Sequence, residues 1–421
     1  MKRENGITLI ALIVTVIVLL ILTGVSITTL TGENGILTQS TRAKDLVELS
    51  TLKEELQLYK LNHIDETINI DNDEINNILT TLKNTKYNGY TPIKNNKIRI
   101  DMKGVKLDKS EKDYIYENLD TFYLVEYSND TEYEIEIKSE KLNTCIINNI
   151  TQSNVNNNIL KLPDYIVKEG KQYKVVGNKY LTIDKDDAIE VKKIFIPETF
   201  ETLSNLGKIN NLKEIYIEDG LSTVGYRCFG GYDMLTYIRL PNTLKTISGA
   251  AFQGCRALKN IAIPDSVTNI GGQAFIGSGL TEVIMPNSVT NIGTQIFQDC
   301  HYLEFVKFSD NTTTLPKGTF VNASCKKIEF SKNLVDIQDN SLGCGLKKIE
   351  IPEGVKKLGN YLFSSSIEKI RIPDTVDEIG DFLCTPDPED GVGKIVYTDN
   401  PIVIDYISKT GATIKNYSDW E

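Results

Sequence analysis

The sequence predicts a multi-domain α+β protein with an N-terminal transmembrane and stalk helix, a small α/β module and a C-terminal β-rich solenoid of parallel strands. Two observations support this architecture. From Val191 onward, one apolar template recurs about every 22 residues, a period typical of solenoids. Near the start of the chain, residues 7–30 contain no charged side chain, and a stretch of that length is typical of a membrane-spanning helix.

The uncharged segment of residues 7–30 follows Lys2 and Arg3. A helix rises about 1.5 Å per residue, so this segment is long enough to cross the roughly 30 Å apolar core of a bilayer. The positive-inside rule keeps the two basic residues in the cytoplasm. We therefore expect a single-pass membrane protein with a cytoplasmic N-terminus, whose remaining chain is extracellular at the cell surface.

Gly6 directly precedes the apolar run, and no Ala-x-Ala-like cleavage site follows that run. The segment Lys-Arg-Glu-Asn-Gly-Ile resembles the class III signal of type IV prepilins. By that resemblance, residues 1–6 are a leader, and prepilin peptidase is a partner that cuts between Gly6 and Ile7. Pilins of that family carry glutamate at the fifth mature position, which is Ala11 here. A plain membrane anchor, or a minor pilin-like subunit with other pilin-like subunits as partners, therefore fits better than a major pilin.

The segment after the apolar run predicts a helical stalk over residues 31–62, because leucines recur there at helical spacing between charged residues. Residues 63–150 have no period and predict a small α/β module. The Asn-rich residues 151–164 are expected to be a linker. Residues 165–421 form the expected solenoid, which ends in a C-terminal cap.

Within the α/β module, alternating apolar residues predict a strand at Ile98 and Ile100. A helix is expected to begin at Asp73, with Ile75, Ile78 and Leu82 at helical spacing, and a second helix at Asp108 or Ser110, either of which can cap it. Residues 122–127 and 133–137 predict a hairpin around the Asn-Asp turn between them.

The repeat template is clearest in the copies that begin at Leu258 and Leu280. With the first residue as offset 0, both place apolar residues at offsets 0, 3, 5, 9, 12, 16 and 17. The same register defines nine repeats and a cap. Two copies are weaker, because polar residues take core offsets in the repeats from Leu303 and Cys325; these residues are Thr312, Thr319 and Ser341.

Offsets 3 and 5 share one face of a strand, because side chains alternate along a strand with period two. Proline at offset 6, as in Pro264 and Pro286, lacks an amide donor and ends the ladder there. Glycines such as Gly271, Gly293 and Gly359 are expected to allow the coil to turn. Short parallel strands should then stack from one repeat to the next.

The consensus I-x-I-P-x-S-V-x-x-I-G-x-x-A-F-x-x-C resembles the BspA-type leucine-rich repeat of bacterial surface proteins. The resemblance covers roughly residues 165–410, and the lead-in from Glu169 to Leu181 resembles the strand pair that often precedes such arrays. It implies a leucine-rich-repeat solenoid, and a role as a surface adhesin or interaction protein. Such repeats serve many partners, so the family implies no particular ligand.

The motifs of catalysis and metal binding are missing from the sequence. His63 and His301 are the only histidines, and neither has cysteine or acidic residues at ligand spacing. There is no nucleophile elbow, no phosphate-binding glycine loop and no zinc-protease motif. We therefore expect neither an enzyme nor a cofactor. The net charge of −11 argues against a nucleic-acid partner.

The chain has seven cysteines, an odd number for an exported protein. Cys255 and Cys300 share one offset but lie two repeats apart. A strand spacing of about 4.8 Å separates them by about 10 Å, which is beyond disulfide reach. We expect buried free thiols that pack as small apolar side chains.

The candidate binding site lies on the exposed face of the sheet, where offsets 2 and 4 point away from the core. Aromatic and apolar residues beside arginine are typical of protein-binding hot spots. The first six repeats carry such residues, whereas the last three carry alternating lysine and glutamate that we expect to pair across strands. The candidate site residues are Phe195, Tyr216, Tyr237, Arg239, Ile284 and Phe305.

Two interpretations of the aromatic residues stay open: a protein ligand docks on them, or the preceding segment or the α/β module covers them. The first leads to a membrane-anchored cell-surface protein that displays its solenoid for protein–protein or cell adhesion. The alternative function is a minor pilin or pseudopilin-like structural subunit of a type IV pilus or secretion filament.

Overall fold

The computed structural model describes most of the chain from Thr91 onward, and it separates two compact units, Met1–Glu126 and Tyr127–Glu421. Besides Ser50 and Glu54, the described residues are 91–94, 97–101, 114–115, 122–125, 127–129, 133–150, 155–156, 158–183, 190–207, 209–364, 366–380 and 394–420. Gly6, Ile7 and the apolar residues 7–30 lie outside this set. Within it, no helix has the length and apolar character needed to cross a bilayer.

The first unit contains a three-stranded sheet of β1 (Thr91–Lys94), β2 (Lys97–Asp101) and β3 (Phe122–Val125). Its strands β1 and β2 are antiparallel, whereas β2 and β3 are parallel. Parallel strands need a crossover connection, and the described residues of that connection, Tyr114 and Ile115, are helical. Strand β2 contains Ile98 and Ile100, which confirms the strand expected there.

The hairpin expected between residues 122–127 and 133–137 does not form. The first segment contributes β3, which pairs with β2, while β5 (Tyr133–Ser139) pairs with β6 (Thr144–Ile150). A local turn signal at Asn129 suggested the pairing. Strand β3 instead pairs with β2, which precedes it, and β5 pairs with β6, which follows it. The two strands of the expected hairpin belong to different units.

The second unit opens with a five-stranded sheet in the order β4-β9-β10-β6-β5. Its remaining strands are β4 (Tyr127–Asn129), β9 (Tyr165–Lys168) and β10 (Lys171–Ile183). The strand pair expected over residues 169–181 is instead one strand, β10, which pairs antiparallel with β9 across the turn at Glu169. This sheet is continuous with the repeats, because Val176 of β10 accepts a hydrogen bond from the amide of Glu201, at 2.9 Å.

The linker expected at residues 151–164 contains two strands, β7 (Val155–Asn156) and β8 (Ile159–Lys161). Strand β8 pairs in parallel with β11 (Lys193–Ile196), and Leu160 is fully buried opposite Ile194. The many asparagines made this stretch read as a loop. Its apolar residues are instead the first layer of the solenoid core, so the described residues 155–156 and 158–164 belong to the solenoid.

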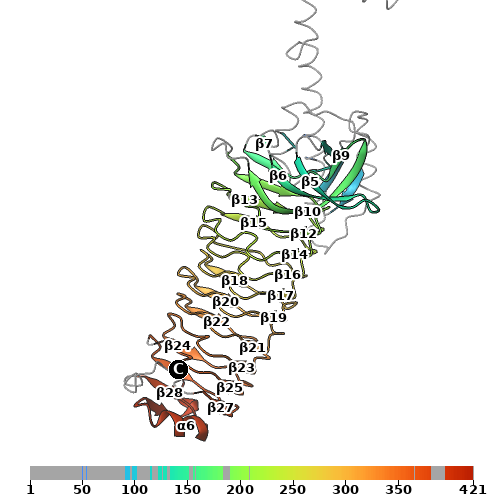
Figure 1. Cartoon of the computed structure of the whole chain (residues 1–421). Helices are drawn as coiled ribbons and strands as arrows, with labels where there is room; N and C mark the ends of the chain where they lie inside the picture. The colour runs from blue at the N-terminus through green and yellow to red at the C-terminus, as the bar shows by residue number, and fades with distance from the viewer. Residues whose placement is uncertain are drawn as a thin grey trace, which may run out of the picture. The chain divides into compact units, whose positions relative to one another are not determined.

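Most repeats contribute one strand to each of two sets of parallel strands, which we call the first and second ladders, and the coils stack along the unit (Figure 1). After β11, the first ladder consists of β13 (Glu214–Ile217), β15 (Tyr237–Arg239), β18 (Glu282–Ile284), β20 (Phe305–Lys307), β22 (Lys327–Glu329), β24 (Lys348–Glu350), β26 (Lys369–Arg371), β28 (Ile395–Tyr397) and β29 (Thr413–Lys415). The second consists of β12 (Thr202–Leu203), β14 (Thr223–Val224), β16 (Thr246–Ile247), β17 (Asn269–Ile270), β19 (Asn291–Ile292), β21 (Thr314–Leu315), β23 (Asp336–Ile337), β25 (Lys357–Leu358) and β27 (Glu378–Ile379). This confirms the predicted solenoid of parallel strands.

The pairing preserves the repeat offset throughout: Ile215 lies beside Ile238, and Val283 lies beside Val306. The first ladder is nevertheless interrupted twice. Residues 260–263 form no strand between β15 and β18, and β22 does not pair with β24. The second ladder has one interruption, between β19 and β21.

A column of phenylalanines at offset 17 forms the centre of the core. Ring centroids of successive members are 5.3–5.8 Å apart. Each ring is fully buried, and the column consists of Phe229, Phe252, Phe275, Phe297 and Phe320. Around it, one apolar cluster runs without a break from Tyr133 to Ile407.

The glycines at offset 13 serve a different purpose from the one expected. Their φ angles are not positive, but a Cβ atom on Gly271, Gly293 or Gly359 would collide with backbone atoms of the preceding coil. The left-handed conformation occurs at offset 15 instead. There it is adopted mostly by residues other than glycine, such as Ala250 and Gln273, with φ of 54° and 60°.

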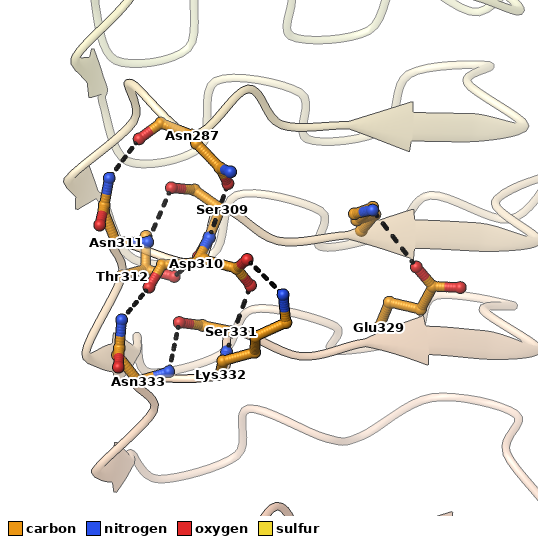
Figure 2. Close-up of polar contacts among 10 residues, drawn as sticks. Asn287, Ser309, Asp310, Asn311, Thr312, Glu329, Ser331, Lys332 and Asn333 are labelled. Carbon is orange, nitrogen blue, oxygen red and sulfur yellow. Dashed lines mark hydrogen bonds and ion pairs between the residues drawn. The ribbon is translucent and has the colours of Figure 1, made fainter.

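The two weak repeats close their turns with side chains in place of proline (Figure 2). Ser309 and Ser331 each accept a hydrogen bond from the amide two residues later, at 3.1 Å. Asn311 and Asn333 then donate to backbone carbonyls of the preceding coil, at 2.6 and 2.7 Å.

The polar core residues of the weak repeats are partly explained by local bonds. The hydroxyls of Thr312 and Thr319 donate to carbonyls three residues earlier, at 2.8 and 2.6 Å. Such bonds satisfy a buried hydroxyl without a partner from another coil. The buried hydroxyl of Ser341 has no hydrogen-bond partner among the described residues.

The solenoid ends in the helix α6 (Pro401–Ile407) and the short 3-10 helix η2 (Tyr417–Asp419). The buried Asn400 joins this cap to the last repeat. Its side-chain oxygen accepts from the amides of Ile402 and Val403, which caps α6. Its side-chain nitrogen donates to the carbonyl of Val376, at 2.7 Å.

The Gly293→Ala substitution should lower the free energy of unfolding by about 3 kcal/mol, because the new methyl group overlaps the backbone of Gly272. Urea denaturation followed by circular dichroism measures this change. Gly345→Ala is the matched control, since nothing lies within 4 Å of its added Cβ. Equal stability of the two variants would contradict the close-packing role of offset 13.

Candidate functional site

The six candidate residues differ in exposure. Tyr237 and Ile284 are 46% and 53% exposed, whereas Phe195 is only 6% exposed. Tyr216, Arg239 and Phe305 are intermediate. The prediction that Phe195 lies on the exposed face is therefore wrong.

Phe195 is buried because it has a neighbour on both sides. Its ring stacks on that of Tyr216, with centroids 4.5 Å apart and planes 11° apart. On the other side it lies opposite Lys161 of β8, which forms a buried ion pair with Asp164 at 3.2 Å. The preceding segment thus covers the first aromatic residue of the column, as one of the two open interpretations expected.

Tyr216 is held in place by polar contacts as well as by stacking. Its hydroxyl donates to the carboxylate of Glu214 at 2.8 Å, and Lys193 pairs with that carboxylate at 3.0 Å. The ring of Tyr237 lies 5.3 Å from that of Tyr216. A contiguous aromatic surface therefore leads outward from the buried Phe195 to the exposed Tyr237.

Arg239 lies beside Tyr237 at the first interruption of the ladder. Its guanidinium is 3.9 Å from the carboxylate of Glu218, a residue that is itself buried. Tyr237 and Arg239 line a groove of about 400 Å³ that reaches Ala262. Ala262 also lines a second groove of about 360 Å³ that reaches Ile284.

The small side chain of Ala262 thus connects Tyr237 to Ile284 across the repeat that contributes no strand. The structure brings Tyr216, Tyr237, Arg239 and Ile284 onto one face. We call the surface formed by Tyr237, Arg239, Ala262 and Ile284 the aromatic face.

Phe305 lies at the edge of the aromatic face, next to the charged half of the sheet. The ammonium of Lys327 is 5.1 Å from the centre of its ring, a distance suited to a cation–π contact. Its strand neighbour is Glu282 and not Ile284. Phe305 therefore belongs to the boundary between the two halves.

The predicted pairing of opposite charges across strands occurs between Lys307 and Glu329, at 3.8 Å, and between Arg371 and Glu350. Lys327 contacts Glu329 within its own strand, at 2.8 Å. The hydrogen bond from Lys327 lowers the pKa of the Glu329 carboxyl. These pairs lie on a solvent-exposed surface, and exposed ion pairs contribute little to stability because water screens them.

The C-terminal tail covers part of this charged surface, which the sequence did not indicate. The guanidinium of Arg371 lies 3.8 Å from the centre of the Tyr417 ring, and the ammonium of Lys348 lies 4.4 Å from that of Trp420. The Tyr417 hydroxyl donates to Glu353 at 2.5 Å. Burial raises the pKa of Tyr417 to about 12. The only sign of this contact in the sequence is that two aromatic residues, Tyr417 and Trp420, follow the last repeat.

The described cysteines are all buried free thiols, as predicted: Cys145, Cys228, Cys255, Cys300, Cys325 and Cys344. Cys255 and Cys300 each donate to a backbone carbonyl, at 3.2 and 3.1 Å. Burial raises the pKa of Cys255 to about 12 and that of Cys300 to about 11. These thiols therefore remain protonated at neutral pH and are poor nucleophiles.

The described part of the chain brings no three side chains of the metal-ligating types together. His301, which it includes, is exposed.

Comparison with known families identifies the repeats. Three overlapping stretches, residues 186–304, 222–342 and 297–385, match the BspA type leucine rich repeat region. Proteins built from such repeats are typically structural or interaction proteins without catalytic activity. No curated protein matches the sequence.

Several solved structures are similar to this chain. A leucine-rich repeat protein from Bacteroides ovatus is 22% identical over 64% of this chain and 70% of its own, with a TM-score of 0.45. A leucine rich cell surface protein from Faecalibacterium prausnitzii is 18% identical over 60% of this chain and 93% of its own, with a TM-score of 0.32.

Thiol reagents should detect the burial of the six described cysteines. In a Cys384→Ser variant, which leaves the six described thiols, an aromatic disulfide reagent at pH 8 should label none in the folded protein and six in denaturant. The reason is that the reagent attacks thiolates and needs access to them. Rapid labelling of Cys255 or Cys300 without denaturant would contradict the burial of these thiols.

Proposed function

We propose that this chain, in which residues 186–385 form a BspA-type leucine-rich repeat region, is a membrane-anchored cell-surface protein that binds a protein partner through its aromatic face. The repeats provide a rigid scaffold, and their exposed sheet positions provide the contacts. Adhesion to a protein or to another cell is the resulting function.

The observation that carries the proposal is the exposure of Tyr237 and Ile284 on either side of Ala262. Large apolar side chains exposed together on a soluble surface mark interaction sites, and tyrosine beside arginine is typical of binding hot spots. The neighbouring Tyr216 is already fixed by Glu214, so it loses little conformational freedom when a partner binds.

The membrane anchor is proposed from the sequence alone. The uncharged residues 7–30 follow Lys2 and Arg3, which favours a cytoplasmic N-terminus and an extracellular solenoid. Cleavage by prepilin peptidase after Gly6 would leave the apolar helix on the mature protein, so the anchor would persist.

The second candidate function is a minor pilin or pseudopilin-like subunit of a type IV pilus or secretion filament. The Gly6–Ile7 junction, with its apolar run, favours it, whereas Ala11 weighs against a major pilin. In this case the solenoid would be carried on a filament instead of being displayed directly from the membrane.

Replacing Tyr237 and Ile284 together with alanine should weaken partner binding at least about tenfold, because hot-spot truncations cost about 1–2 kcal/mol each. The partner is first identified on intact cells by a photo-crosslinking amino acid at Tyr237, and the affinity of the full-length protein is then measured. Adding Tyr216→Ala should reduce binding further.

The control is the pair Tyr226→Ala and Val335→Ala, which truncates side chains of similar exposure away from the aromatic face. Both double variants should keep the circular dichroism of the unaltered protein. Unchanged affinity of the Tyr237/Ile284 variant, or equal loss in the control, would refute the proposed docking site.

Mass spectrometry of the protein from its native membrane should find Ile7 as the mature N-terminus, with a methylated amine. Substitution of Gly6 by leucine should leave residues 1–6 attached, since the resemblance places cleavage after glycine. A mature chain that begins after residue 30, or one that retains Met1 in the unaltered protein, would exclude this processing. Recovery in sheared filaments would favour the pilin-like function over the anchor.

A further inference from the structure

The outward face of the last strands carries a tyrosine beside an arginine, as the face of the first strands does. Tyr397 of β28 pairs in register with Arg371 of β26. Tyr216 of β13 pairs in the same way with Arg239 of β15. Tyr397 points outward, because its neighbour Val396 belongs to the core cluster and side chains alternate along a strand. Tyrosine beside arginine is typical of binding hot spots, so the sheet carries this combination twice.

The second combination differs from the first in that the C-terminal tail covers it. This tail is the segment of residues 416–420 and includes η2. Tyr397 is 3% exposed, and the ring of Trp420 meets its ring edge to face, with centroids 5.2 Å apart. The guanidinium of Arg371 lies 3.8 Å from the centre of the Tyr417 ring. The two rings of the tail thus cover the two side chains of the hot spot.

The tail lies on the sheet without entering the core. Ile414 of β29 still packs against the core cluster, whereas Tyr417 and Trp420 do not belong to it and are only half-buried. The Tyr417 amide donates to Asp399 at 3.2 Å, and its hydroxyl donates to Glu353. Both acceptors are exposed, so water can replace these bonds. Displacement of the tail would therefore leave the core of the solenoid intact.

The tail also leaves one polar group of the hot spot without a partner. The Nε atom of Arg371 is buried and has no hydrogen-bond partner among the described residues, although its Nη1 atom pairs with Glu350. A buried donor without an acceptor is unfavourable, and this opposes the covered state. A ligand that brings an acceptor to this nitrogen gains a bond that the tail does not make.

We propose that the C-terminal tail is a displaceable strap over a second docking face, formed by Arg371 and Tyr397, and that this face binds an aromatic peptide segment of a partner protein in its place. We call it the covered face. The tail shows the chemistry that fits: two rings three residues apart, one over the guanidinium and one against the tyrosine. A partner segment with the same spacing can make the same contacts. The covered face lies in other repeats than the aromatic face, so each can bind without the other.

The probe is the tail's own sequence as a free peptide, Asn-Tyr-Ser-Asp-Trp-Glu, with an N-terminal fluorescein label and an amidated end. Fluorescence anisotropy measures its affinity for the full-length protein. The Tyr417→Ala and Trp420→Ala double variant should bind this peptide at least about tenfold more tightly than the unaltered protein does. The reason is that the attached tail competes for the covered face at an effective concentration of about millimolar.

Matched peptides and variants test the contacts. A peptide with both rings replaced by alanine should bind the double variant at least about tenfold more weakly. Adding Arg371→Ala to the double variant should weaken binding of the tail peptide to a similar extent. Arg256→Ala, at an exposed position in another repeat, is the matched control and should change the affinity less than about twofold. Adding Tyr237→Ala and Ile284→Ala should have equally little effect, so failure of the aromatic face and failure of the covered face are distinguishable.

The double variant should keep the circular dichroism of the unaltered protein, because both rings lie outside the core. Equal affinity of the double variant and the unaltered protein for the tail peptide would overturn the proposal. So would a correctly folded double variant that does not bind the peptide.

A milder variant serves if the double variant does not fold. Tyr417→Phe removes only the hydroxyl that donates to Glu353, so it loosens the tail and leaves its rings in place. Its affinity for the tail peptide should be at least about twofold higher than that of the unaltered protein. An unchanged affinity would count against a displaceable tail.

Discussion

Register between successive coils is the constraint on which the whole solenoid depends. Every residue lies against the residue at the same offset one coil away, so a favourable choice is repeated along the stack and an unfavourable one is repeated as well. Ile215 beside Ile238 and Phe252 beside Phe275 are consequences of one spacing. Hydroxyls at offset 8 follow the same rule, since Thr243, Ser266 and Thr375 each donate to a carbonyl of the preceding coil.

The sequence predicts the parts of the structure that repeat, because a recurring side chain reports a recurring environment. The first ladder, the apolar character of the phenylalanine positions and the buried thiols were predictable for that reason, whereas the second ladder was not predicted. The exposure of Phe195 was not, because its neighbour is β8, which lies outside the period and reads as a polar linker. The contacts of Tyr417 and Trp420 were not predicted for the same reason: both residues lie outside the repeat period, in the C-terminal segment that folds back on the sheet.

Glycine shows where a correct pattern leads to an incorrect physical reason. Gly293 recurs because no side chain fits between coils, whereas the turn itself is formed two residues later by Gln295, with φ of 58°. A recurring glycine shows that a position requires glycine. It does not show whether the reason is a lack of space for a side chain or a backbone conformation that other residues avoid. The interruptions of the ladders are likewise invisible in the template, since Ile261, Ile328 and Ile349 all occupy the same apolar offset.

The contacts of Asn400 bear on how the stack of coils is closed. A stack of identical layers has no intrinsic end, and an open end presents the same backbone groups that each layer offers to the next. Asn400 occupies the Val376 carbonyl and turns the chain into α6, while β29 is the last strand of the first ladder. The side chain thus ties the last repeat to the cap that follows it, and the first ladder still gains one strand, β29, beyond this point.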